Sequence, residues 1–135
     1  MLNPTPLTQQ DPDFSSRENR ERLAKMVTKL FEHWNLPLAD QAALLGHSSD
    51  SRSTINRYRN GAPLADSVDL LNRVGHLLAI HKSLRIIFPY NRELAYRWVT
   101  TPNARFGGRA PIEIMKARYE GVLLVRRYLD FERGR

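Results

Sequence analysis

The sequence predicts an all-α protein, and three observations predict it. Apolar residues recur at three- and four-residue spacing in every long segment, which is the spacing of one face of an α-helix. The strict alternation of apolar and polar residues that marks a half-buried strand persists nowhere. Residues that end helices separate the segments: Gly46, Asn60, Pro89 and Pro102.

Length and composition limit the class of protein. The 135 residues, 41% of them hydrophobic, are enough for one domain or two small ones with a buried core. The absence of cysteine excludes disulfides and thiolate metal sites and fits a reducing compartment. No apolar run approaches the roughly 20 residues of a membrane-spanning helix. The first ten residues lack a signal-peptide pattern, so we expect a cytoplasmic protein with no membrane partner.

The charge is strongly positive, with 21 basic residues against 14 acidic ones and a net charge of +7. This excess suggests a polyanionic partner, most simply nucleic acid. A generally basic protein without such a partner is the alternative, and the distribution of the charges has to decide between them.

Residues 1–14 carry three prolines among polar residues and are predicted to form a flexible arm. A helix should begin at Ser15 or Ser16, either of which can cap it, and end near Asn35. Its apolar stripe is expected in the core and consists of Leu23, Met26, Val27, Leu30, Phe31 and Trp34.

Two short helices should follow, over residues 37–45 and from about residue 50 to Asn60, with Gly46 ending the first. Two short helices joined by a glycine-bearing turn are the arrangement of a helix-turn-helix DNA reader. The segments A-A-L-L-G and S-T-I-N-R-Y-R-N-G resemble the DNA-binding domains of Xre and phage repressors, with Ile55 and Tyr58 at inward-facing positions. The link after Gly46 is longer than their usual turn, and Gln41 stands where an apolar residue is more usual.

Residues 51–61 contain three arginines and no acidic residue, as a helix entering the major groove requires. Mapped onto the repressor pattern, one group faces base edges: Arg52, Ser53, Thr54, Asn56 and Arg57. A second group is placed for phosphates: Ser48, Ser49, Arg59 and Asn60. A solvated basic helix is the alternative. Such readers bind operator DNA as dimers, so we expect a homodimer or a higher oligomer.

A long helix should run from Asp66 or Ser67 to just before Pro89. Gly75 within it costs about 1 kcal/mol relative to alanine, so we expect another helix to cross closely there. The apolar stripe, wide enough for core and dimer contacts together, is Leu70, Leu71, Val74, Leu77, Leu78, Leu84 and Phe88. A short helix capped by Asn91 comes next.

The most informative stretch is residues 98–121, read as a corner between two helices. Thr101 precedes a proline and cannot easily stay helical, Gly107-Gly108 supplies backbone freedom for a tight turn, and Pro111 suits the first position of a helix. Taken alone, this pattern indicates a packed connection between two helices, with Trp98 and Phe106 as aromatic anchors on either side of the turn. The residue before the second helix is Ala110, which is a poor helix cap.

The motifs W-V-T-T-P-N, F-G-G-R-A-P-I-E-I-M and G-V-L-L-V-R-R-Y-L resemble the toxin-binding domain of the Xre/MbcA/ParS antitoxins. The resemblance implies a RES-domain toxin as the partner, with an ADP-ribosyltransferase-like fold that attacks NAD and an active site blocked by the antitoxin's C-terminal domain. It implies toxin contacts at the corner, through Trp98, Pro102, Asn103, Phe106, Gly107, Gly108, Arg109 and Pro111.

The terminal segment R-Y-L-D-F-E-R-G-R combines aromatic anchors with charged groups, a mixture that tends to carry interface energy. Its candidate contacts are Tyr128, Phe131, Glu132, Arg133 and Arg135. An arginine or the terminal carboxylate could occupy a pocket built for a charged dinucleotide. A frayed tail on a core helix is the alternative.

No catalytic or metal-ligand pattern is present: the four histidines form no H-x-x-x-H pair, and no glycine-rich phosphate loop follows a strand. We therefore expect no enzyme activity, no cofactor and no metal site. The expected protein is an antitoxin that represses its own operon, nucleoid-associated when bound to its operator, with an arm over 1–14, a helix-turn-helix region over 15–88 and a toxin-binding region over 89–135. A stand-alone repressor and a structural dimer module are the alternatives.

Overall fold

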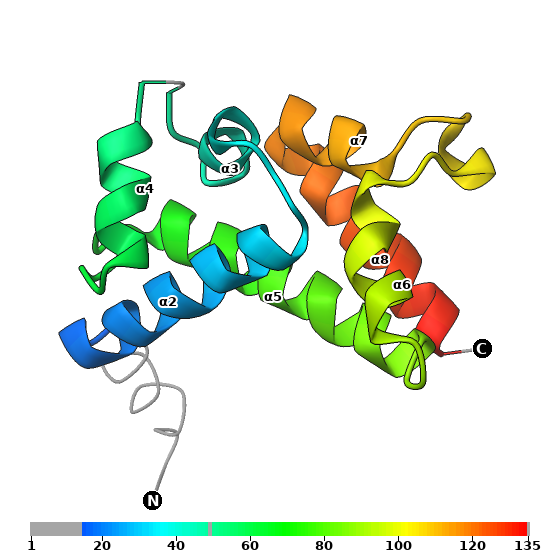
Figure 1. Ribbon diagram of the computed structural model, residues 1–135, viewed down its shortest axis with the longest axis horizontal. Helices are drawn as coiled ribbons and strands as arrows, with labels where there is room; N and C mark the ends of the chain where they lie inside the picture. Colours follow the sequence, from blue (N-terminus) through cyan, green and yellow to red (C-terminus); the bar gives the residue numbers. More distant parts are fainter. Residues whose placement is uncertain (1–14, 49, 135) are drawn as a thin grey trace, which may run out of the picture.

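The computed structural model describes residues 15–48 and 50–134 and confirms the all-α fold (Figure 1). The predicted arm over 1–14 lies outside the described residues. The α-helices are α2 (Arg17–His33), α3 (Leu38–Leu44), α4 (Arg52–Arg59), α5 (Val68–Ile87), α6 (Arg92–Arg97), α7 (Pro111–Ala117) and α8 (Tyr119–Arg133). Two short 3₁₀ turns, η1 (Trp98–Thr100) and η2 (Ala104–Phe106), lie between α6 and α7. No helix in the described part of the chain is long and apolar enough to cross a bilayer.

Helix α5 is the axis of the molecule. It packs against α2, α6 and α8, with α2–α4 gathered around one end and α6–α8 around the other (Figure 1). Because α5 is covered from more than one side, it buries residues around much of its circumference. The expected core residues Leu70, Leu71, Val74, Leu77 and Leu84 are buried, and so are Ile80 and Ser83, which the predicted stripe did not include.

Helix α2 begins as expected, with the Ser16 Oγ accepting a hydrogen bond from the backbone N–H of Asn19 at 3.1 Å. It ends at His33, close to the predicted stop, and the positive φ of 58° at Asn35 reverses the chain just beyond it. Most of the predicted stripe is core, but the placement of Met26 in the core is wrong, since its exposure is 46%. Met26 lies instead at the edge of a groove between α2 and α5.

The close helix crossing expected at Gly75 is also wrong. A Cβ atom built there meets nothing within 4 Å among the described residues. The close approach occurs at Gly121, which is buried in the first turn of α8. A Cβ at Gly121 would overlap the carbonyl oxygen of Ile114 and lie 2.7 Å from its carbonyl carbon. The absence of a side chain at Gly121 is therefore what lets α7 and α8 touch backbone to backbone.

Candidate functional site

The corner between η1 and α7 is a tight turn closed by backbone hydrogen bonds. The Asn103 N–H donates to the Arg109 carbonyl at 3.1 Å, and the Gly108 N–H donates back to the Asn103 carbonyl at 3.0 Å. The Asn103 side-chain oxygen accepts from the Arg105 N–H at 2.9 Å. Gly107 and Gly108 adopt φ values of 68° and 83°, a region that favours glycine. The turn is thus held in one shape, which fixes the direction of the side chains it carries.

Three aromatic rings lock this turn onto α8. Trp98 stacks on Tyr128 with ring centroids 6.3 Å apart, and Phe106 meets both rings edge-on, at 6.1 and 5.3 Å. All three side chains are partly buried against the core. These offset and edge-to-face arrangements are the ones aromatic pairs prefer. The cluster joins η1, η2 and α8, so it brings together residues that are far apart in the sequence.

The start of α7 matches the sequence prediction. Pro111 is its first residue and is buried, and Ala110 precedes it without any side-chain capping hydrogen bond. The geometry of this junction is therefore set by proline and by the packing on α8 rather than by a cap.

A groove of about 770 Å³ opens beside the aromatic cluster, between the turn, α7 and α8. Its residues are Arg105, Phe106, Arg109, Ile114, Leu124, Arg127, Tyr128 and Phe131. Leu124 and Phe131 are exposed by 49% and 66% and line the same groove, so the groove carries exposed apolar surface. The sequence prediction included half of this set and missed Arg105, Ile114, Leu124 and Arg127. The missed α8 residues could have been found from helical spacing, because Leu124 lies four residues before Tyr128 and Arg127 four residues before Phe131.

The other predicted residues of this region lie outside the groove lining. Arg133 donates from Nη1 to the Ser83 hydroxyl on α5 at 3.3 Å, on the side of α8 that faces the core helix. Pro102, Gly107 and Gly108 are exposed in the turn itself, and Glu132 is partly buried. Arg135 lies outside the described residues.

The candidate DNA-reading helix, α4, presents most of its predicted residues to solvent. Arg52, Ser53 and Arg57 are exposed, as are Asn60 after the helix and Ser48 in the link before it, while Thr54 and Asn56 are partly buried. Ile55 and Tyr58 are buried beneath the helix, as expected. Ser49 lies outside the described residues.

Arg59 is tied into the protein rather than pointing freely outward. Its Nε lies 3.2 Å from a carboxylate oxygen of Glu32, and its guanidinium donates to Asn56 at 2.7 Å and to Gln41 at 3.5 Å. Gln41 is buried and donates from its amide to the Leu36 carbonyl at 2.9 Å. A buried glutamine is tolerated at this position because both ends of its amide are satisfied.

Two polar connections join the two ends of the molecule. Lys116 on α7 forms an ion pair with Asp40 on α3, in which Lys116 Nζ donates a hydrogen bond to Asp40 Oδ1 at 3.3 Å. This hydrogen bond raises the pKa of Lys116 above its usual value. On α5, Arg73 lies over the Tyr119 ring at 5.0 Å, and the Tyr119 hydroxyl is 3.0 Å from Nε2 of His76. Helices α3 and α7 are therefore in direct contact, and α5 bridges to the start of α8.

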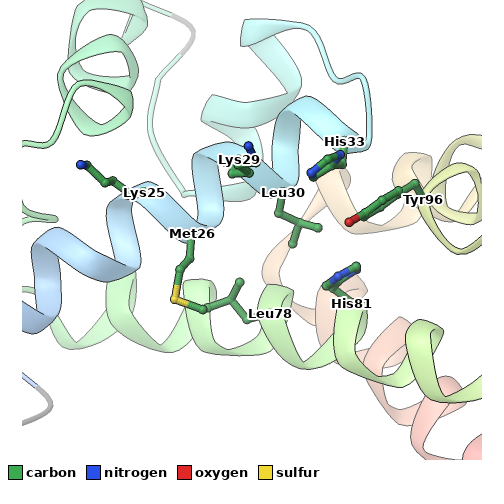
Figure 2. Close-up of a pocket in the computed structure, with 8 residues that line it drawn as sticks. All are labelled: Lys25, Met26, Lys29, Leu30, His33, Leu78, His81 and Tyr96. Atoms are coloured by element: carbon green, nitrogen blue, oxygen red, sulfur yellow. The ribbon is translucent and has the colours of Figure 1, made fainter. Parts of the chain in front are cut away.

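A second groove, of about 390 Å³, lies between α2, α5 and α6 (Figure 2). At one end of it Tyr96 is stacked between two histidines, with ring centroids 4.2 Å from His33 and 5.2 Å from His81. The pKa of His81 is lowered, mainly because the ring is withdrawn from solvent and to a smaller extent by the charges of Arg85 and His33. The lowered pKa favours a neutral His81 ring at pH 7. Among residues 15–48 and 50–134, no three histidine or acidic side chains gather in a way that could hold a metal ion.

Two comparisons with known proteins bear on this site, one over its own part of the chain and one over most of the chain. Residues 83–135 match the family model described as the antitoxin Xre/MbcA/ParS C-terminal toxin-binding domain. An uncharacterized protein, y4oB of Sinorhizobium fredii (strain NBRC 101917 / NGR234), is 37% identical over 109 residues, which cover 78% of this chain and 80% of that protein. The turn, the aromatic cluster and the whole lining of the larger groove fall within the matched residues.

Proposed function

The chain belongs to the family of antitoxins with the Xre/MbcA/ParS C-terminal toxin-binding domain, and from this we propose that it neutralises a RES-domain toxin in the cytoplasm and represses its own operon. The observation that carries the proposal is the coincidence of the matched residues with the groove and its aromatic cluster. Exposed apolar surface beside a rigid turn is the kind of surface that protein partners cover.

We assign toxin binding to the turn, the groove and the outer side of α8. Docking there would place the end of α8 against the entrance of the toxin's active site, so that NAD cannot enter. The proposed mechanism is steric and requires no catalytic residue of this chain. The aromatic cluster would contribute indirectly, by holding the turn and α8 at a fixed distance before the toxin arrives.

The direct test uses purified components. The RES-domain toxin that the proposal names as the partner is incubated with NAD while the chain is titrated in. We expect NAD loss to fall to zero at a fixed molar ratio, and the two proteins to elute together from a sizing column. Undiminished NAD loss at a large excess of the chain contradicts the proposal.

The N-terminal half would carry the second activity. We propose that residues 15–88 form the DNA-reading region and residues 89–135 the toxin-binding region, and that a homodimer or higher oligomer spans a palindromic operator. What supports this is the exposure of Arg52, Ser53 and Arg57 on α4 above a buried face. Arg59 is the least free of the basic residues on α4, because Glu32 already neutralises it.

Replacing Arg52 or Arg57 by alanine should weaken operator binding by about 1–3 kcal/mol, or roughly 5- to 150-fold. Each change removes a guanidinium that can pair with a guanine edge or a phosphate. Gel-shift titration measures the effect, and Arg92→Ala, an exposed arginine on α6, is the matched control. Neutralisation of the toxin should be unchanged in all three variants. Equal operator affinity in the wild type, Arg52→Ala and Arg57→Ala would remove α4 as the recognition helix.

A further inference from the structure

The positive charge of this protein is concentrated in the residues that match the toxin-binding domain, although they are fewer than half of the chain. Residues 83–135 hold 11 basic and 5 acidic residues, a net charge of +6, out of +7 for the whole chain. Residues 1–82, which include the candidate DNA-reading helix, hold 10 basic and 9 acidic residues, a net charge of +1. The charge therefore points to the partner of residues 83–135 more than to the partner of α4.

Three of these basic residues converge on the larger groove. Arg105 and Arg109 come from the turn and Arg127 from α8, and all three are exposed. Within the described residues none of their guanidinium groups forms an ion pair, whereas Arg126 pairs with Asp130 and Lys116 with Asp40 and Glu113. Three like charges gathered around one groove repel one another, and a bound anion would relieve that repulsion.

The groove also presents apolar surface alongside these arginines. Ile114, Leu124 and Phe131 line it, and the last two are largely exposed. Arg105 and Arg109 flank the turn closed by the Asn103 hydrogen bonds, so their starting positions are fixed before a partner binds. A complementary occupant therefore carries negative charge for the arginines and an apolar side chain for the exposed leucine and phenylalanine.

We propose that this groove receives an acidic segment of the toxin, with carboxylates against Arg105, Arg109 and Arg127 and an apolar side chain on Leu124 and Phe131. The inference rests on the proposed function, since it names the chemistry of the toxin surface that docks here. A second copy of this domain carries the same positive charge and is repelled. A nucleic-acid backbone supplies anions but leaves the exposed leucine and phenylalanine uncovered.

The test compares two triple variants of equal charge. The groove variant combines Arg105→Gln, Arg109→Gln and Arg127→Gln, and the control combines Lys82→Gln, Arg92→Gln and Arg97→Gln, all exposed positions outside the groove. Toxin affinity is measured by calorimetry at low and high salt. We expect the groove variant to bind at least about 30-fold more weakly at low salt and to lose most of the salt dependence. The control should stay close to the wild type, and both variants should melt near the wild-type temperature.

The possible outcomes distinguish a failure of this inference from a failure of the proposed function. A wild-type chain that fails to bind the toxin overturns the proposed function and the inference together. If the wild type binds and both triple variants bind equally well, or weaken equally, the groove assignment alone is overturned. A groove variant that binds toxin normally but loses operator DNA in a gel shift assigns the arginines to nucleic acid and also overturns it.

Discussion

Gly121→Ala is expected to destabilise the protein by about 3 kcal/mol or more, which for a chain of this size lowers the melting temperature by roughly 10 °C. The added methyl group would overlap the backbone carbonyl of Ile114, and a backbone atom at a helix contact cannot rotate away as a side chain can. Helices α7 and α8 would have to separate, so the groove between them would change shape as well. Thermal unfolding followed by circular dichroism measures the loss.

Gly75→Ala is the matched control, since it makes the same change in another helix, α5. A Cβ at Gly75 meets nothing within 4 Å among the described residues, so the variant should gain about 0.5–1 kcal/mol from the better helix propensity of alanine. If the two alanine variants melt at the same temperature, the backbone contact between α7 and α8 is wrong.

Phe131→Ala should weaken toxin binding by about 2 kcal/mol or more, roughly 30-fold, while changing stability by less than about 0.5 kcal/mol. The ring is 66% exposed in the free protein, so removing it costs little there, whereas in the complex it would be a buried aromatic anchor. Surface plasmon resonance with immobilised toxin gives the affinity, and a melting curve gives the stability.

Tyr90→Ala is the control for this prediction. Tyr90 is fully exposed and belongs to the matched residues 83–135, but it lies between α5 and α6, outside the groove. Its removal should leave toxin affinity unchanged. Equal affinities for both alanine variants would mean that the outer side of α8 does not contact the toxin.

The helices could be predicted from the sequence because their ends are decided locally. Ser16 caps α2, Asn35 reverses the chain after it, and Pro111 opens α7, each through its own backbone or side-chain preference. The turn around Gly107 and Gly108 was predictable for the same reason. The aromatic anchors could be predicted as well, because Trp98, Phe106 and Tyr128 are large side chains that are stabilised by packing against other apolar groups.

Contacts between distant segments could not be predicted in this way. Gly75 and Gly121 are both glycines within helices, and only the path of α7 decides which of them meets another backbone. The gathering of Arg105 and Arg109 with Arg127 likewise depends on how the turn folds over α8. Met26 fits the apolar spacing of α2 but lies at the edge of a groove, because α5 covers only part of that helix.

The central claim, that this chain protects a cell from a RES-domain toxin, is tested most directly by expressing that toxin with and without it. Cellular NAD and viable counts are followed after induction, with the chain supplied from a separate promoter so that operon repression plays no part. We predict that NAD and viability hold steady when the chain is present and collapse when it is absent. Equal collapse in both cultures, with the chain present as folded protein, contradicts the account.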